Sequence, residues 1–508
     1  VSIIYPNDGE QNDNFGNAVD ISGNLSVIGA YSAKIDGVAT GMAYIYRFND
    51  THWVQEGKLT SEGSQSHDFF GWSVACYHNV VIVGAYMASG DSYPVGAAYI
   101  FAPAKGNTWS RQAILKAPYR DIDDDGGSPE YIYFGWSVEV YKGTAFVGAY
   151  GDTALGSFSG SVFVFKRKRS GKNSYDVSWE QQTQLLASDG AAFDSFGWCV
   201  SAYGDYVVIG AYGDTDSADD DAYASSQSDE TYAGSAYVFN LTEANNNWAG
   251  GWSQMAKLRL PDGARHDFFG WSASIWRDNA VVSAHSSSVD NYGTGAVYVW
   301  KRSNSMVWSL QAKLSPKEQD KSLYFGYCVS LYNNILAVGA YGDSYNSNSQ
   351  REGTVYIYVG QTSGAYVMYG EKWYLQARLW PNRTQTKDDF GVSVAIYNDV
   401  VLVGSKLANG NSEDSGGAYA FSEAKDAKQT YFPVDNNTFV ALAALVPIGF
   451  IVLFGIALCI MLVCFPPKKS LIEEIHEEVD DSAVEIASPS SHSVSSRLLI
   501  SNKSSNET

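Results

Sequence analysis

Three aspartates in one short segment have the spacing of metal ligands. Asp121, Asp123 and Asp125 alternate with other residues, and Gly126 follows them directly. Alternating carboxylates followed by a glycine open a calcium-binding loop, because the turn at the glycine lets the oxygens converge on one ion. The twelfth position of such a loop normally carries a closing glutamate, and here it is Ile132. We therefore favour a solvated acidic loop, and calcium is the one cofactor that the sequence suggests.

A second acidic segment, residues 213–231, contains seven acids and no base. Together with the first acidic segment, residues 119–133, it interrupts neighbouring units of a repeat, so the two could build one anionic patch. The candidate ligand-binding residues in the second segment are Asp214, Asp216, Asp219, Asp220 and Asp221.

The repeat that positions these segments occurs seven times. Each unit begins with a Phe-Gly pair, and the pairs are Phe15-Gly16, Phe70-Gly71, Phe134-Gly135, Phe196-Gly197, Phe269-Gly270, Phe325-Gly326 and Phe390-Gly391. An apolar run such as VVIVGAY follows each pair, then a run such as GAAYIF, then a run that starts with Trp. Short runs rich in Val, Ile, Tyr and Phe between Gly, Asn and Asp predict strands. Four antiparallel strands in each unit make one blade, so the sequence predicts an all-β fold, a seven-bladed β-propeller.

The ends of the repeat region predict how the ring closes. The run that starts with Trp occurs only six times and is missing from the seventh unit. The N-terminal segment VSIIYPNDGEQNDNFG aligns with QAKLSPKEQDKSLYFG, which contains that run in the sixth unit. We therefore expect residues 1–5 to form the fourth strand of blade seven, which leaves no open sheet edge.

Aromatic residues recur directly after the repeated glycine. They are Trp72, Trp136, Trp198 and Trp271 in four units and Tyr327 in a fifth. A ring of aromatic side chains could stack on carbohydrate, but we favour packing between blades.

Aspartates and cysteines recur at matching positions as well. Aspartates stand three residues before the glycine in five units: Asp13, Asp68, Asp194, Asp267 and Asp388. Their regular place before a turn predicts side-chain caps rather than ligands. Cys199 and Cys328 occupy equivalent sites in blades that are not adjacent, so we expect them, and Cys76, to be buried free thiols.

These phrases resemble FG-GAP repeats, the units of the integrin α-chain propeller and of many bacterial and protist surface proteins. Residues 185–214 resemble the bacterial and protist subtype in particular. The resemblance covers roughly residues 1–425 and implies the propeller fold. The DxDxDG calcium loop that some integrin blades carry between their first two strands has no counterpart here, because that hairpin is short in every unit. The membrane-proximal GFFKR of integrins is also absent, which places an integrin-type heterodimer in doubt.

The C-terminal part of the chain predicts a membrane anchor. Residues 439–465 are uncharged and almost wholly apolar, and about 20 such residues suffice to cross a bilayer. Lys468 and Lys469 follow at once and mark the cytoplasmic side. The expected organisation is therefore an extracellular propeller over 1–425, a stalk over 426–438, the transmembrane helix, and a disordered, serine-rich cytoplasmic tail over 466–508.

The anchor and the chain start define a topology. A single-pass type I protein of the plasma membrane or an endomembrane would have its N-terminus outside or in the lumen. A start at Val1 fits removal of a signal peptide, and a truncated fragment would start in the same way. Cys464, at the inner membrane edge, is a candidate for lipidation. The tail suits a cytosolic sorting or signalling adaptor.

Propeller topology assigns the connections to two faces. Connections from a fourth strand to the next first strand, and from a second to a third strand, share one end, which we call the top face. The remaining turns share the other end, the bottom face. The candidate glycosylation sites are Asn24, Asn49 and Asn240, expected on the bottom face, and Asn382, expected on the top face.

These observations favour a recognition or adhesion protein whose propeller binds an extracellular protein or glycan. A structural or trafficking scaffold that binds other membrane proteins in cis is the alternative. The sequence contains no recognisable nucleophile–base set, metal cluster of strong spacing or phosphate loop, so we do not expect an enzyme. The net charge of −21 argues against nucleic acid as a partner, because phosphates need a basic surface.

Overall fold

The structure is a computed structural model. It describes residues 1–61, 66–88, 95–104, 108–118, 131–169, 177–215, 232–242, 251–260, 267–287, 294–316, 323–343, 352–360, 373–381 and 388–422.

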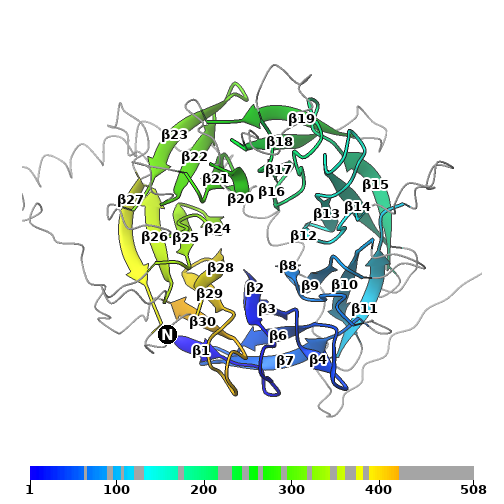
Figure 1. The fold of residues 1–508 in the computed structure, drawn as a ribbon, viewed down its shortest axis with the longest axis vertical. Helices are drawn as coiled ribbons and strands as arrows, with labels where there is room; N and C mark the ends of the chain where they lie inside the picture. Colours follow the sequence, from blue (N-terminus) through cyan, green and yellow to red (C-terminus); the bar gives the residue numbers. More distant parts are fainter. Residues whose placement is uncertain are drawn as a thin grey trace, which may run out of the picture. The chain divides into compact units, whose positions relative to one another are not determined.

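The described residues form seven four-stranded antiparallel sheets arranged as the blades of a ring (Figure 1). The predicted all-β, seven-bladed propeller is therefore confirmed. In blades one to six the strands are neighbours in the order of the sequence, so each blade is a simple meander.

The first four blades take their strands from residues 15–258. Blade one contains β2 (Phe15–Ser22), β3 (Leu25–Ala30), β6 (Met42–Phe48) and β7 (Trp53–Leu59). Blade two contains β8 (Ser73–Tyr77), β9 (Val80–Ala85), β10 (Ala97–Pro103) and β11 (Trp109–Leu115). Blade three contains β12 (Ser137–Tyr141), β13 (Thr144–Ala149), β14 (Ser161–Arg169) and β15 (Val177–Leu185). Blade four contains β16 (Val200–Tyr203), β17 (Tyr206–Ala211), β18 (Ser235–Thr242) and β19 (Gly251–Leu258).

The last three blades complete the ring. Blade five contains β20 (Phe269–Trp276), β21 (Asn279–Ala284), β22 (Ala296–Arg302) and β23 (Trp308–Leu314). Blade six contains β24 (Val329–Tyr332), β25 (Ile335–Ala340), β26 (Thr354–Gly360) and β27 (Trp373–Leu379). Blade seven contains β28 (Phe390–Tyr397), β29 (Val400–Ser405), β30 (Gly417–Ser422) and β1 (Ser2–Ile4). A small hairpin, β4 (Lys34–Ile35) with β5 (Val38–Ala39), lies between β3 and β6.

The N-terminal strand closes the ring as predicted. Strand β1 pairs antiparallel with β30, with Ser2 opposite Ala420 and Ile4 opposite Ala418. Figure 1 shows the N-terminus at the outer edge of blade seven. The first and last described strands of the chain therefore share one sheet, and the outer edge of β30 is covered.

The Phe-Gly pair is where each blade meets the one before it. All seven phenylalanines are completely buried. The backbone N–H of each donates to a carbonyl near the start of the preceding blade's third strand, as from Phe70 to Thr40 (3.0 Å) and, across the closure, from Phe15 to Ser415 (3.2 Å). Glycine is required beside it, because Gly71 has a φ of +92° and an added Cβ would lie 2.1 Å from the Met42 carbonyl oxygen.

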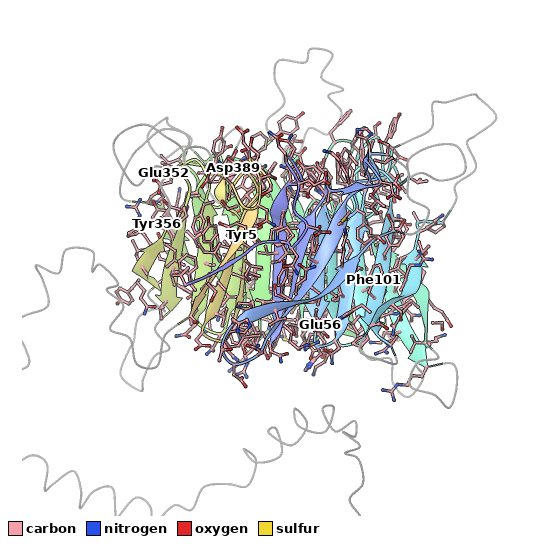
Figure 2. All side chains as sticks on the ribbon, turned by 90° about the horizontal axis from the view of Figure 1, so that it is seen from below. Tyr5, Glu56, Phe101, Glu352, Tyr356 and Asp389 are labelled. Atoms are coloured by element: carbon pink, nitrogen blue, oxygen red, sulfur yellow. The ribbon has the colours of Figure 1, made fainter. Side chains whose placement is uncertain are left out.

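The first strand of every blade is innermost and the fourth is outermost. Seen from the side, Asp389 and Glu352 lie at the top face, and Glu56 lies toward the bottom face (Figure 2). Within the part of the chain that the structure describes, no helix has the length and hydropathy of a membrane span. The predicted transmembrane segment 439–465 and tail 466–508 lie outside that part.

Candidate functional site

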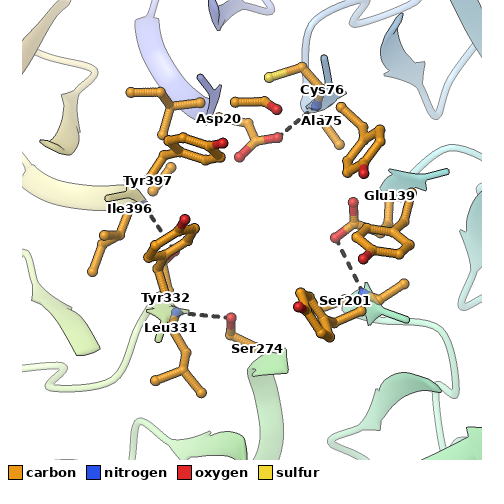
Figure 3. Close-up of a pocket in the computed structure, with 18 of the residues that line it drawn as sticks. Asp20, Ala75, Cys76, Glu139, Ser201, Ser274, Leu331, Tyr332, Ile396 and Tyr397 are labelled. Carbon is orange, nitrogen blue, oxygen red and sulfur yellow. Dashed lines mark hydrogen bonds between the residues drawn. The ribbon is translucent and has the colours of Figure 1, made fainter. Parts of the chain in front are cut away.

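A channel of about 260 Å³ runs between the seven inner strands, and each of them lines it. These strands are sheet edges, so backbone N–H groups on their inner side have no partner within their own blade. Figure 3 shows polar side chains among the residues that line this space.

Serines at the same strand position in three neighbouring blades accept hydrogen bonds from these N–H groups. Each serine accepts a hydrogen bond from the inner strand of the next blade. Ser201 Oγ accepts from Ile275 N (3.3 Å), Ser274 Oγ from Leu331 N (3.0 Å), and Ser330 Oγ from Ile396 N (3.1 Å). The channel residues thus tie adjacent blades together at their inner edges.

Two acids occupy the equivalent position in blades one and three. Asp20 Oδ2 accepts from Cys76 N of blade two (2.6 Å), and Glu139 Oε2 accepts from Ala202 N of blade four (3.4 Å). Each carboxylate also accepts the N–H that follows it in its own strand, from Ile21 and from Val140 (2.8 Å) respectively.

The second hydrogen bond of each acid has a simple cause. The blades before them carry alanine at the equivalent position, Ala395 before Asp20 and Ala75 before Glu139. The alanine side chain has no hydrogen-bond acceptor. The backbone N–H that would otherwise donate to a serine of the preceding blade therefore donates to the carboxylate in the same strand. The two acids therefore serve two N–H groups each, and the ring of seven is satisfied by five polar side chains.

Burial sets the protonation of these acids. It raises the pKa of Asp20 to about 6, against the lowering effect of the N–H groups of Cys76 and Ile21. It raises the pKa of Glu139 to about 8, with a further contribution from the charge of Asp20. The cluster is suited to holding blades together, and across the described ranges no group of three His, Cys, Asp or Glu side chains could hold a metal ion.

Aromatic rings cover the top end of the inner strands. Trp72, Trp136, Trp198 and Trp271 contact one another in sequence, with centroids 4.6 to 4.8 Å apart, and Tyr327 lies 5.7 Å from Trp271. The predicted packing of these residues between blades is confirmed. Tyrosines directly after the second strands stand edge-on between the indoles, as Tyr150 does between Trp136 (4.8 Å) and Trp198 (5.1 Å).

A further layer of rings stacks on these tyrosines. The residue before the Phe-Gly pair is aromatic in four blades, and its ring is near-parallel to that of the residue directly after the second strand. The pairs are Phe69–Tyr86, Tyr133–Tyr150, Phe268–His285 and Tyr324–Tyr341, with centroids 4.8 to 5.7 Å apart. Burial lowers the pKa of His285 to about 4, so this imidazole is neutral like the rings that it replaces.

Blades seven and one interrupt the aromatic layer. They carry Asp389 and Asn14 before the Phe-Gly pair, and Val392 and Asn17 after it. Lys406 directly follows the second strand of blade seven, and its ammonium lies 3.6 Å from the Asp389 carboxylate. The top face thus has an aromatic sector over blades two to six, which Tyr31 of blade one extends by its contact with Trp72 (5.1 Å), and a more polar sector over the rest of blades seven and one.

A family model described as the FG-GAP repeat matches residues 1–46, 53–101, 179–239, 252–300, 308–358 and 373–421, more than half of the chain. The chain belongs to the FG-GAP repeat family. Each matched segment joins an outer strand to the first three strands of the next blade, so the family repeat is offset by one strand from the blade. Strands β12 to β14 of blade three lie outside the matched segments, although they have the same topology.

Solved structures similar to this FG-GAP protein include two of Sqt1 from Chaetomium thermophilum. The first, bound to the N-terminus of the ribosomal protein L10, is 11% identical with a TM-score of 0.40 and covers 81% of this chain and 97% of its own. The second is 12% identical with a TM-score of 0.39 and covers 81% and 88%. Similarity of this extent carries no argument about function. No curated protein matches the chain.

In this FG-GAP protein Asp214 lies shortly after the end of β17, in the connection to β18, and it is buried. Its side chain is part of a buried network in blade four, where it accepts from the Tyr237 hydroxyl (2.7 Å) and pairs with Lys257 (2.7 Å). Blade six repeats this network with Asp343, Tyr356 and Arg378.

The remaining acidic candidates lie outside the described residues. They are Asp121, Asp123 and Asp125 of the first segment and Asp216, Asp219, Asp220 and Asp221 of the second. The same holds for Asn382 and Cys464.

Three sequons are in the described part of the chain. Asn24 lies in the turn between β2 and β3, Asn49 in the turn between β6 and β7, and Asn240 near the end of β18. All three are at the bottom face, as their loop assignment predicts. The Asn49 amide oxygen accepts from Thr51 Oγ1 (2.8 Å), so the two polar residues of that sequon bond each other.

Two of the five repeated aspartates have the predicted role of turn caps. Cys76, Cys199 and Cys328 are free thiols as predicted, with Cys76 buried and Cys199 and Cys328 half-buried. Cys199 Sγ donates to the Gly270 carbonyl (3.3 Å) of the next blade's Phe-Gly pair, as Ser73 and its equivalents do elsewhere. Turn caps are present in blades one and four, where Asp13 Oδ2 and Asp194 Oδ2 each accept a backbone N–H three residues upstream (2.8 Å).

Sequence reasoning missed Asp20 and Glu139. A signal was available, because each is the one acid in its first strand and each follows a blade with alanine at that position.

Proposed function

We propose that this FG-GAP protein is a membrane-anchored recognition or adhesion protein whose propeller presents its top face to an extracellular or lumenal ligand, a protein or a glycan. The observation that supports this most is the aromatic sector over blades two to six. Tyr131 and Phe193 belong to it and are 44% and 51% exposed. A large cluster of partly exposed rings on one face is typical of binding surfaces.

Two features of the chain support the orientation. The apolar segment 439–465 followed by Lys468 and Lys469 would anchor the protein with the propeller outside. The sequons at Asn24, Asn49 and Asn240 lie at the bottom face, so glycans there would leave the aromatic sector free. The tail from residue 466 on would then face a cytosolic sorting or signalling adaptor.

Topology is tested on cells that express the full chain behind a heterologous signal peptide. An antibody to residues 490–508 should stain only permeabilised cells, and an epitope placed before Val1 should be stained on intact cells. Staining of intact cells by the tail antibody would overturn the type I orientation.

Recognition is tested with the same cells. Cells that display the chain should attach to a monolayer of non-expressing cells more than mock-transfected cells do, and Phe193→Asn should reduce this attachment. Tyr374 is the matched control, because it is 49% exposed but lies on β27 at the outer edge of a blade. Tyr374→Ala should leave attachment unchanged. Attachment that no top-face substitution alters would speak for a scaffold acting in cis.

A further inference from the structure

We propose that the aromatic sector at blades three and four binds a neutral glycan of β-linked pyranoses. This inference rests on the proposed recognition function and names the class of ligand. It is carried by backbone strain, by the stacking geometry of the rings, and by charge.

The backbone of the top face is strained at aromatic residues. Six of them have a left-handed backbone with φ between 52° and 71°: Phe69, Tyr133, Phe158, Phe193, Phe268 and Tyr324. This conformation is unfavourable for a bulky side chain, whereas Asn and Asp adopt it readily.

The fold itself does not require aromatic residues at these turns. In blade one, Asn14 (φ 58°) takes the place of Tyr133, and Asn12 (φ 67°) takes the place of Phe193. In blade seven, Asp389 (φ 52°) takes the place of Tyr133. The chain thus accepts strain in blades three and four that it avoids in blades one and seven. An aromatic residue that stays at a strained position, where other blades place a less strained Asn or Asp, indicates selection for the aromatic side chain itself.

The rings of blades three and four form two near-parallel stacks. Tyr131, Tyr133 and Tyr150 form one, with successive centroids 5.9 and 4.8 Å apart and ring planes within 19° and 6° of each other. Phe158 and Phe193 form the other, 6.2 Å apart and within 11°. The stacks adjoin, since Tyr133 and Phe158 are 6.3 Å apart.

Each stack ends in an exposed ring. Tyr131 and Phe193 are the outermost members and the most exposed ones, so each has one face stacked and offers the other to solvent. Two open ring faces, joined by a continuous path of rings, suit a ligand made of several flat, semi-polar units in a row.

A β-linked pyranose has that shape. Its equatorial hydroxyls point outward and its axial C–H groups form a weakly positive patch on each face, which the negative face of an aromatic ring attracts. The phenol hydroxyls of the tyrosine stack can exchange hydrogen bonds with the sugar hydroxyls at the ring edges. The net charge of −21 disfavours sulfated or sialylated chains, so the favoured glycan is neutral.

The test uses the full chain purified in detergent, with cellotetraose and chitotetraose as probes and a heparin tetrasaccharide as the anionic comparison. Binding is followed by calorimetry and by tryptophan fluorescence, because Trp136 and Trp198 both contact Tyr150. We expect saturable binding of at least one neutral probe and none of heparin.

The diagnostic variant is Phe193→Asn, which copies Asn12 of blade one. Losing one stacking ring should weaken binding roughly tenfold. The melting temperature should stay the same or rise, because Asn fits the left-handed backbone. Tyr131→Ala should weaken binding similarly, and Tyr374→Ala should change nothing.

Three results would overturn the inference. One is a Phe193→Asn variant that melts lower but binds as the wild type does, because the ring would then serve packing alone. Another is preferred binding of heparin. The third is that neither neutral probe binds, while Phe193→Asn still abolishes cell attachment. The ligand would then be a protein, and the proposed recognition function would stand. If attachment is also absent, both proposals fail.

Discussion

The hydrogen bonds in the channel predict that one destabilising substitution is repaired by a second one in the neighbouring blade. Glu139 accepts two backbone N–H groups, from Val140 and Ala202, because Ala75 of blade two has no acceptor. Glu139→Ser should keep the bond to Ala202, in the way that Ser201 serves Ile275. It should leave Val140 N–H without a partner.

The expected magnitude follows from that single group. A buried N–H without an acceptor costs about 1–3 kcal/mol. For a ring of this size, whose unfolding entropy grows with the number of residues, that loss lowers Tm by about 1–3 °C. Ala75→Ser in the Glu139→Ser background restores the serine arrangement of blades four to six, so it should recover most of the loss. Ala75→Ser alone should be nearly neutral, because Glu139 already serves Val140.

The assay is a double-mutant cycle by scanning calorimetry and urea unfolding at pH 6. At this pH, below the pKa of about 8, Glu139 is protonated in the folded state, so the substitution removes little buried charge. The coupling between the two sites should be favourable by about 1 kcal/mol or more. A double variant no more stable than Glu139→Ser would refute the view that these residues share one N–H group.

Three further predictions concern other parts of the chain. Because burial raises the pKa of Glu139 to about 8 from an ordinary value of 4.5, its contribution to stability is complete below pH 4.5 and is lost as the pH rises through 8. Glu139→Gln should flatten Tm against pH in that range, and an unchanged profile would contradict the assignment. Deletion of residues 1–6 removes β1 and exposes β30, so the shortened chain should be retained inside the cell; normal export at unchanged Tm would contradict the closure. Calcium and magnesium at millimolar concentration should shift Tm alike. A calcium-selective gain in the free energy of unfolding, about 2.7 kcal/mol at a hundredfold excess over Kd, would establish a metal site if Asp121→Asn, Asp123→Asn and Asp125→Asn together abolish it.

The sequence determined the architecture of this protein because each repeat unit contains short motifs that predict its strands and turns. Seven Phe-Gly pairs, the small residues at the ends of the second strands and the missing seventh outer strand predict the blade count and the closure by residues 1–5. The structure places Ser2–Ile4 in blade seven. Every interface between blades needs a glycine that has positive φ and lies close to the backbone of the neighbouring blade. This glycine therefore recurs in each repeat unit and can be recognised in the sequence.

The tertiary structure alone decided which polar residues have partners inside the fold. Asp214 is one of seven acids in its segment, yet the residue is only 5% exposed and its carboxylate is hydrogen-bonded within blade four. Glu139 reads as a lone acid in a strand, yet the alanine that explains it is in the previous blade. Tyr133 stands directly before a Phe-Gly pair, yet only the structure shows that this position is left-handed in every blade, with φ between 52° and 58°. Each of these environments depends on a residue from another strand or blade, and strand periodicity defines the face of a side chain but not the neighbour across an interface.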